Sequence, residues 1–261
     1  MWLRAVTGKT LFKFLLLVFL VGTFMVSGQP DYPQAVWNPA YKNNYTTSNR
    51  EETYDIRWII IHVAEGSYSG TISWFKNPQA KVSAHYVVKM DGSEITQMVR
   101  DKDVAWHAGN WAYNTHSIGI EIEGYVGVTR WPDSMYDALA KLVAWLAKKY
   151  KIEPVHPKGV APANPESSTG IIGHNQVPDP NNPRLGGGKS HHSDPGSTFD
   201  WDKFMKLVRK YYYGSENVSQ STETPTDEGE GFNIYTILAI AGAFTGLAVI
   251  LVIVYMLLKS K

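Results

Sequence analysis

The chain has 261 residues, enough for one medium-sized domain with appended segments. Its formal net charge of +1 gives no bulk electrostatic reason to bind nucleic acid or an acidic partner. It contains no cysteine, which excludes disulfides, thiolate metal ligands and a thiol nucleophile. Nine Trp and 15 Tyr suit a groove for sugars or peptides, although a large core would also account for them.

Residues 1–28 have the pattern of an export signal. Basic residues at positions 4, 9 and 13 precede the apolar run FLLLVFLVGTFMVSG, which ends in small residues. This run is shorter than the ~20 apolar residues that a membrane span needs, which favours a cleaved signal peptide over an uncleaved signal anchor. In both cases the following domain is exported. Residues 29–53 are polar and aromatic with three prolines, and we expect an extended arm there.

The folded domain is expected at 54–213, and its first half reads mainly as strands. Residues 56–63 form an apolar, β-branched run typical of a buried strand, and it ends in a histidine. A short helix follows at about 71–76. Residues 82–90 and 94–99 form two strands joined by an Asp-Gly hairpin turn.

The second half of the domain combines one more strand with two helices. Residues 117–123 form the strand. Asp133 or Ser134 caps a helix whose apolar face, at three- and four-residue spacing, consists of Met135, Leu139, Leu142, Leu146 and Tyr150. Asp200 caps a last helix that runs to about Tyr212. Strands mixed with helices predict an α/β fold: a mixed central β-sheet flanked by helices, in a single catalytic domain.

The C-terminal end predicts a membrane anchor. Residues 214–232 read as an acidic flexible linker, and 233–258 as a transmembrane helix, because positions 234–258 carry no charge. Acidic residues precede this segment, and lysines follow it in the short tail 259–261. The positive-inside rule places that tail in the cytoplasm and the domain outside the cell membrane.

A loop-rich stretch at 171–201 concentrates groups that bind metals. His174, His191, His192 and Asp194 lie within 21 residues, and imidazole and carboxylate are standard zinc ligands. His62 ends a strand, the position where open α/β sheets place their chemistry. On these residues alone, two alternatives to a metal site remain. The loop histidines could be ordinary polar loop residues, and His62 could be covered by a neighbouring loop.

Four segments together resemble the zinc-dependent N-acetylmuramoyl-L-alanine amidases of the type 2 family, relatives of phage lysozyme-amidases and peptidoglycan recognition proteins. They are IIIHVAEG at 59–66, VSAHYVVKMDGSEITQMV at 82–99, VAWHAGN…SIGIEIEG at 104–124 and GHNQVPDP…HSDPGSTFDW at 173–201. The resemblance covers about residues 54–212. It implies a Zn²⁺ ion held by His62, His174 and Asp194, with water in the fourth position.

The resemblance also implies roles for residues around the metal. Glu121 transfers the proton of the attacking water; strand geometry alone leaves Glu123, on the same face, as an alternative. His192 stabilises the developing oxyanion. His191 is expected to face solvent, since adjacent loop residues point in opposite directions.

His107 matches a position that lines the substrate groove, and Trp106 and Asn110 are expected to join it. Trp106 could equally be a core residue instead of a groove residue. His85 is expected to be a buried, hydrogen-bonded histidine. His116, His156 and the Pro-rich loop at 153–170 receive no assignment.

The resulting hypothesis is a membrane-tethered zinc amidase that cleaves the bond between N-acetylmuramic acid and L-alanine in peptidoglycan. The alternative is a peptidoglycan recognition module that holds the same substrate without cutting it, because one fold serves both roles. Retention of all three metal ligands favours the enzyme. A third hypothesis is a zinc amide hydrolase that acts on another peptide or small amide.

Overall fold

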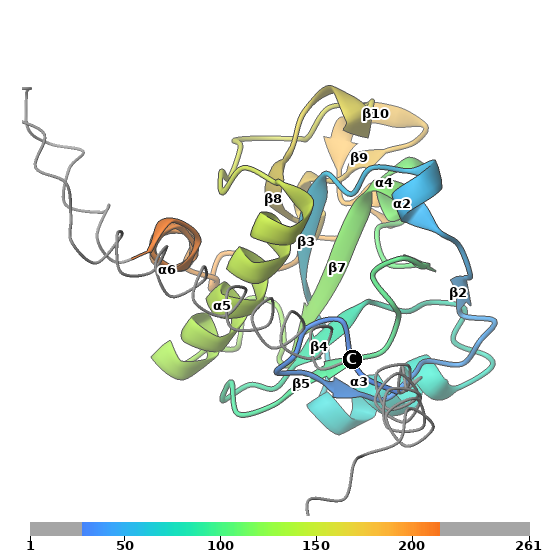
Figure 1. Ribbon diagram of the computed structural model, residues 1–261. Coiled ribbons are helices and arrows are strands. Elements are labelled where there is room, and N and C mark those ends of the chain that lie inside the picture. Colours follow the sequence, from blue (N-terminus) through green and yellow to red (C-terminus); the bar gives the residue numbers. More distant parts are fainter. Residues whose placement is uncertain (1–27, 215–261) are drawn as a thin grey trace, which may run out of the picture. The chain divides into compact units, whose positions relative to one another are not determined.

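The structure is a computed structural model, and it describes residues 28–214 (Figure 1). The predicted signal segment, acidic linker, transmembrane helix and tail therefore lie outside the described residues, apart from the boundary positions 28 and 214. Between 28 and 214, no helix is both long and apolar enough to cross a membrane. The chain divides into two units, Met1–Val218 and Ser219–Lys261, and everything described below belongs to the first.

A six-stranded mixed sheet forms the centre of the domain. Its strand order is β1-β5-β4-β7-β3-β8, with β4–β7, β7–β3 and β3–β8 parallel and β4–β5 antiparallel. Its strands are β1 (Val36–Trp37), β3 (Trp58–Val63), β4 (Tyr86–Val88), β5 (Ile95–Gln97), β7 (Ser117–Ile122) and β8 (Gly170–Gly173). The predicted α/β fold with a mixed central sheet is confirmed.

Helices and two small ladders complete the domain. The helices are α2 (Arg50–Thr53), α3 (Tyr68–Lys76), α4 (Trp111–His116), α5 (Asp133–Tyr150), α6 (Trp201–Tyr213) and the 3₁₀ turns η1 (Pro165–Ser167), η2 (His174–Gln176) and η3 (Gly188–Ser190). The ladders pair β2 (Tyr45–Thr46) with β6 (Val104–Ala105) and β9 (Pro178–Asp179) with β10 (Asn182–Gly186).

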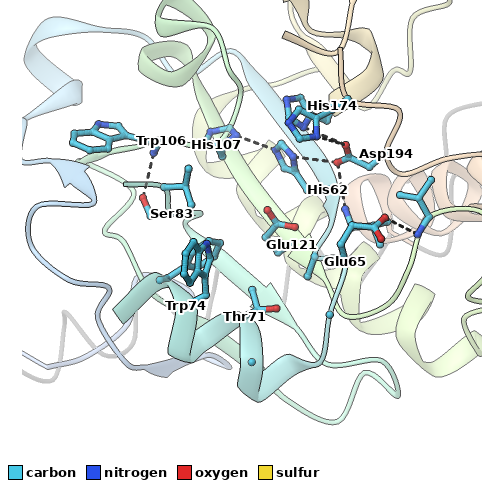
Figure 2. Close-up of a pocket in the computed structure, with 18 of the residues that line it drawn as sticks. His62, Glu65, Thr71, Trp74, Ser83, Trp106, His107, Glu121, His174 and Asp194 are labelled. Atoms are coloured by element: carbon cyan, nitrogen blue, oxygen red, sulfur yellow. Dashed lines mark hydrogen bonds and ion pairs between the residues drawn. The ribbon is translucent and has the colours of Figure 1, made fainter. Parts of the chain in front are cut away.

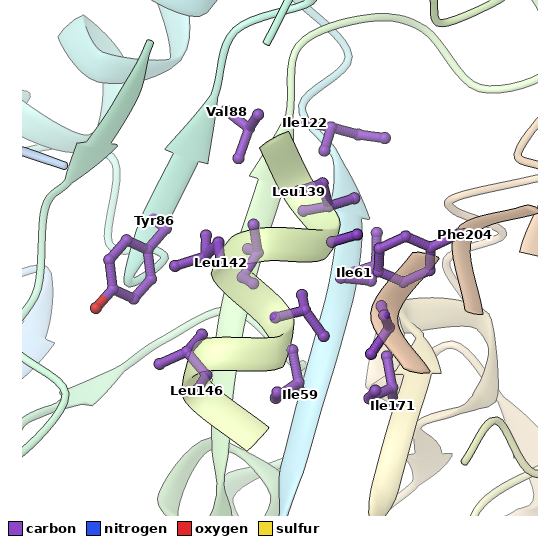
Figure 3. Close-up of a cluster of buried hydrophobic side chains, with 14 of the residues drawn as sticks. Ile59, Ile61, Tyr86, Val88, Ile122, Leu139, Leu142, Leu146, Ile171 and Phe204 are labelled. Carbon is purple, nitrogen blue, oxygen red and sulfur yellow. The ribbon is translucent and has the colours of Figure 1, made fainter. Parts of the chain in front are cut away.

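The two faces of β3 serve different purposes. Successive side chains of a strand point to opposite faces of the sheet. Ile59 and Ile61 therefore lie in the large core beneath α5 and α6, together with Leu139, Leu142 and Phe204 (Figure 3). Trp58 and Ile60 lie in a separate cluster with residues of α4 and β8. His62 shares their face, so it points away from the main core.

Most predicted elements appear, with changed ends. The helix predicted at 71–76 begins at Tyr68, because the side chain of Ser67 accepts a hydrogen bond from the Gly70 amide. The strand predicted at 82–90 is shortened to β4. Its hairpin turn forms as predicted, with Gly92 at a φ of +73°, which glycine adopts without a steric penalty.

The predicted cap of α5 is wrong, whereas that of α6 is confirmed. Pro132 is the N-cap of α5, and it makes no side-chain cap bond because proline has no side-chain acceptor. Asp133 is the first helical residue, and its side chain pairs with Lys203. Asp200 caps α6 by accepting the amide of Lys203. The cap of α5 was misplaced because proline before a helix supplies a fixed φ rather than a side-chain acceptor.

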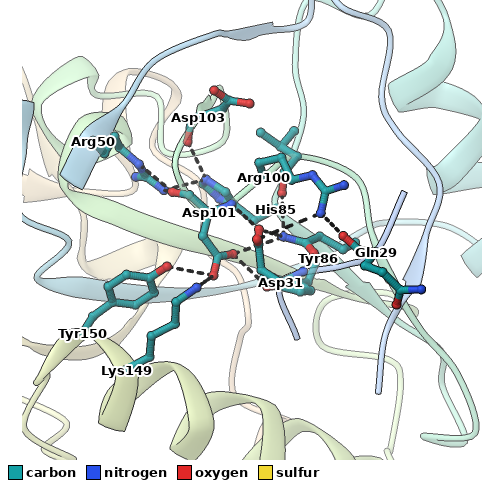
Figure 4. A network of polar contacts seen from close by, with 12 residues as sticks. Gln29, Asp31, Arg50, His85, Tyr86, Arg100, Asp101, Asp103, Lys149 and Tyr150 are labelled. Atoms are coloured by element: carbon teal, nitrogen blue, oxygen red, sulfur yellow. Dashed lines mark hydrogen bonds and ion pairs between the residues drawn. The ribbon is translucent and has the colours of Figure 1, made fainter. Parts of the chain in front are cut away.

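Residues 29–53 are part of the domain and not an arm that leads into it. β1 adds an edge strand to the central sheet, and Arg50 of α2 is fully buried (Figure 4). The Arg50 guanidinium donates to the carbonyl oxygens of Asp101, Asn114, Thr115 and Ser117. The arm was predicted because two-residue strands and a one-turn helix leave no periodic pattern in a sequence.

Candidate functional site

A cleft of about 560 Å³ opens at the carboxyl ends of β3 and β7, on the face away from α5 (Figure 2). Parallel strands end at the same edge of a sheet, and ligands bind at that edge in open α/β sheets. His62 is the second-last residue of β3, and Glu121 occupies the paired position on β7. The cleft therefore begins where the sequence placed its strand-end histidine.

Three separate segments bring His62, His174 and Asp194 together. His174 begins η2 directly after β8, and Asp194 lies in the loop before α6. Asp194 Oδ2 is 3.3 Å from His62 Nδ1, and its Oδ1 is 3.3 Å from His174 Nδ1. All three residues are buried, and one ligand atom of each lies within 4.8 Å of the others.

This arrangement fits a small divalent cation. A tetrahedral zinc ion with bonds of about 2.0–2.2 Å separates its ligand atoms by roughly 3.3–3.5 Å. Burial, and secondarily the neighbouring His174, lowers the pKa of His62 to about 4, so that its imidazole is neutral at neutral pH. Burial opposes ionisation of Asp194, but its contacts with the His174 and His62 rings hold its pKa below the ordinary value. Two neutral imidazoles and one carboxylate are the protonation states that a metal ion requires.

The loop that carries His174 is tied down by its own backbone and side chains. The amide of Gly173 donates to the side-chain oxygen of Gln176, and the Gln176 amide group donates to the carbonyls of Pro157 and Gly159. The unassigned loop at 153–170 thus supports η2. This support fixes the direction in which the His174 ring leaves the chain.

Glu121 is the free carboxyl group of the cleft. The residue is half-buried, but its Oε2 atom is fully buried, and within residues 28–214 that atom finds no hydrogen-bond partner. Burial, and secondarily the charge of Asp194, raises the pKa of Glu121 to about 8. Glu123 differs, because its carboxylate accepts the backbone amides of Tyr68 and Met90 at 2.9 and 2.8 Å. The structure therefore separates two glutamates that strand geometry leaves equivalent.

The adjacent histidines 191 and 192 face different ways. The His192 ring stacks on His174, with ring centroids 4.5 Å apart and an interplanar angle of 16°, and its side chain is 54% exposed at the cleft. Burial, and then His174, lowers the pKa of His192. His191 is exposed, as predicted, and its Nε2 lies 2.8 Å from Asp179. Of the two, His192 is the one available to a molecule in the cleft.

Two of the three residues predicted to bind substrate line the cleft, and one does not. His107 and Trp106 line it, and the Trp106 indole N–H donates to Thr46. Asn110 is not among the lining residues: it caps α4, and its side-chain amide donates to the Pro178 carbonyl. Asparagine is a common N-cap residue, so its position directly before α4 was the sequence signal for this capping role.

His85, predicted to be buried and hydrogen-bonded, is fully buried, and its Nδ1 accepts the amide of Gly119.

The sequence analysis did not identify several residues that line the cleft. Thr71 and Trp74 of α3 form one wall, and Trp74 is 48% exposed. Glu65, labelled in Figure 2, and Val126 also line the cleft, and the Val126 amide donates to the Glu65 carboxylate. The available signal was Trp74, a large apolar residue on the polar side of a short helix. The sequence of the helix alone does not show that this side faces a cleft.

Comparisons with known proteins agree on one family. The model of a family described as N-acetylmuramoyl-L-alanine amidase matches residues 52–197. N-acetylmuramoyl-L-alanine amidase A of Achromobacter lyticus is 36% identical over 182 residues, 68% of this chain and 95% of that protein. The 1,6-anhydro-N-acetylmuramyl-L-alanine amidase AmpD of Salmonella typhimurium is 33% identical over 153 residues, 54% of this chain and 68% of AmpD. The crystal structure of a selenomethionine derivative of AmpD aligns with 67% of this chain and 94% of its own, at 25% identity and a TM-score of 0.49.

Proposed function

The chain belongs to the N-acetylmuramoyl-L-alanine amidase family, and we propose that it is a zinc-dependent hydrolase of the amide bond between N-acetylmuramic acid and L-alanine in peptidoglycan. One observation carries the proposal beyond family membership. Ligand atoms of His62, His174 and Asp194 converge within 4.8 Å in the cleft that Glu121 also lines, and the Oε2 of Glu121 has no hydrogen-bond partner among residues 28–214. A cleft that holds metal ligands and a free acid–base group suits amide hydrolysis.

His62, His174 and Asp194 would hold the zinc ion, and no cysteine is required. Bound there, zinc supplies the positive charge that polarises an amide carbonyl and favours the ionisation of water. All three side chains line the cleft together with Glu121, His107 and His192, so the site is reached from the cleft side. Substrate and water would enter from that side.

Glu121 is proposed to move the proton. Its Oε2 is buried and without a partner among the described residues, so its ionised form is free to accept a proton from water, and its protonated form to pass that proton to the leaving L-alanine nitrogen. His192 is proposed to donate an N–H group to the carbonyl oxygen as negative charge develops on it. Its ring stacks on His174, and its Nδ1 lies 3.8 Å from Asp194 Oδ1.

The exported, membrane-tethered location remains part of the proposal. It is supported by the basic and apolar pattern of residues 1–28 and by the uncharged run at 234–258, which is followed by lysines. A tether of this kind would keep the cleft on the outer side of the membrane, where peptidoglycan lies.

The experiment that tests the function is digestion of purified cell wall by the full chain. We expect new L-alanine amino termini in the presence of zinc, and none with a His174→Ala variant. A wild-type chain that binds muropeptide and zinc but releases no amino terminus would instead be a recognition module. Release of other amines from peptides or small amides, without L-alanine termini, would support the third hypothesis.

A further inference from the structure

Three consecutive hydrogen bonds lead from a backbone carbonyl to the candidate ligand His62. His62 Nε2 lies 3.0 Å from His107 Nδ1, and His107 Nε2 lies 3.3 Å from Ser117 Oγ. The Ser117 hydroxyl reaches the carbonyl oxygen of Tyr113 at 2.5 Å. Figure 2 shows His107 between Trp106 and His62, with its ring directed at His62.

The carbonyl at the far end fixes the direction of every bond in this chain. A carbonyl oxygen only accepts, so the Ser117 hydroxyl donates its one hydrogen to Tyr113. Ser117 Oγ then accepts from His107, which places the His107 proton on Nε2. A neutral imidazole has one donor and one acceptor, so the unprotonated Nδ1 of His107 must accept a hydrogen bond from the N–H group at His62 Nε2.

The result is a defined tautomer of His62. With its proton on Nε2, the ring presents a bare Nδ1 to Asp194 Oδ2 at 3.3 Å, and the two lone pairs face each other. This contact is favourable when a cation lies between the two atoms. We propose that His107 and Ser117 are positioning residues that hold His62 in the tautomer whose Nδ1 binds the metal. This inference depends on the proposed metal site and assigns His107 a task other than substrate binding.

Local structure holds the His107 ring in place. Its backbone amide and that of Ala108 both donate to the side-chain oxygen of Asn114, at 3.1 and 2.8 Å. The ring lies so close to β7 that a Cβ on Gly119 would come within 2.4 Å of it. Glycine at 119 is therefore what makes room for the ring.

The two possible tasks of His107 predict different measurements. Both of its ring nitrogens are engaged, so neither is left for a hydrogen bond to substrate. If His107 positions His62, its loss weakens zinc binding by the metal-free full chain, with no substrate present. If it binds substrate, its loss raises KM and leaves zinc affinity unchanged.

The test measures zinc affinity of the full chain by competition with a chromophoric chelator. We expect His107→Leu to weaken binding by ~10- to 100-fold, the usual effect of losing the group that orients a ligating histidine. His107→Asn retains an acceptor near the Nδ1 position and is expected to recover affinity to within about threefold of the wild type. His116→Leu is the matched control, because His116 is also buried but pairs with Glu166 and does not line the cleft.

Nitrogen NMR measures the tautomer directly in the wild-type chain. The metal-free chain should show His62 protonated at Nε2 and bare at Nδ1, with the signal assigned by its loss in His62→Ala. A His62 protonated at Nδ1, or a His107→Leu affinity equal to that of His116→Leu, overturns the inference. Equal loss in His107→Leu and His107→Asn also overturns it. If His62→Ala and His174→Ala bind zinc as the wild type does, the metal site itself is wrong, and the proposed function fails first.

Discussion

His62 and Glu121 are direct partners in the parallel register of β3 and β7. Neighbouring strands lie about 4.8 Å apart, and paired residues of a parallel ladder project from the same face. The backbone hydrogen bonds of the sheet thus set a candidate metal ligand beside a candidate proton carrier. Two residues 59 positions apart in sequence are thus held side by side by the β3–β7 ladder.

Replacing each glutamate of the β7 end separately distinguishes their roles. We expect Glu121→Gln to lower kcat by about 10²- to 10⁴-fold, with zinc content and stability retained, because glutamine keeps the shape but cannot carry the proton. Glu123→Gln should leave kcat nearly unchanged and lower the free energy of unfolding by about 1–2 kcal/mol, because its carboxylate accepts two backbone amides. Muropeptide cleavage and urea unfolding measure the two effects. A larger loss of kcat in Glu123→Gln would reverse the assignment.

The raised pKa of Glu121 predicts how the metal-free chain responds to pH. The pKa of Glu121 rises from 4.5 to about 8 on folding, so the folded chain binds its proton more tightly than the unfolded chain does. The associated stability is fully present below pH 4.5 and is lost as the pH rises through about 8. Urea unfolding in the presence of a chelator should therefore show a decrease from pH 5 to 8.5 that Glu121→Gln lacks. Parallel curves for the two proteins would contradict the buried, unpaired state of this carboxyl group.

Adding a methyl group at residue 119 should disturb the His107 ring. In Gly119→Ala the new Cβ would lie 2.4 Å from the ring, so the ring or the strand must shift. We expect a loss of about 1–3 kcal/mol in unfolding free energy, together with weaker zinc binding. Gly66→Ala is the control for stability, because a Cβ there meets one carbonyl oxygen at an ordinary 3.8 Å. Equal thermal unfolding of the two variants would show that the ring position does not depend on glycine.

Arg50 tests whether residues 29–53 belong to the fold. Its guanidinium supplies several donors to buried carbonyls, and a lysine ammonium in the same place reaches fewer of them. Arg50→Lys should lower the free energy of unfolding by about 3 kcal/mol or more, since buried carbonyls lose their partners. Arg57→Lys is the matched control, with a partly exposed side chain that donates to one carbonyl, and it should cost less than about 1 kcal/mol. Similar losses in urea unfolding would show that the Arg50 network contributes no more than a surface contact.

Much of the fold was predictable because its signals are local. The run at 56–63 is apolar and β-branched and became β3, and the Asp-Gly turn joined β4 to β5. The spacing of Leu139, Leu142 and Leu146 predicted the buried face of α5, and all three are fully buried. In each case a repeat or turn residue acts on its sequence neighbours, so the pattern can be read without the rest of the chain.

The sequence alone determined the candidate metal ligands, since the motifs around His62, His174 and Asp194 identify these three residues. Only the tertiary structure decided how they are used. It leaves Glu121 Oε2 without a hydrogen-bond partner among the described residues, whereas Glu123 accepts two backbone amides. It places Asn110 at the N-cap of α4 instead of in the cleft, and it brings His107 within hydrogen-bond distance of His62. Strand register, burial and the availability of a partner depend on segments far apart in the chain. The physical cause is that hydrogen bonds and desolvation act over a few ångströms of space, whatever the distance along the sequence.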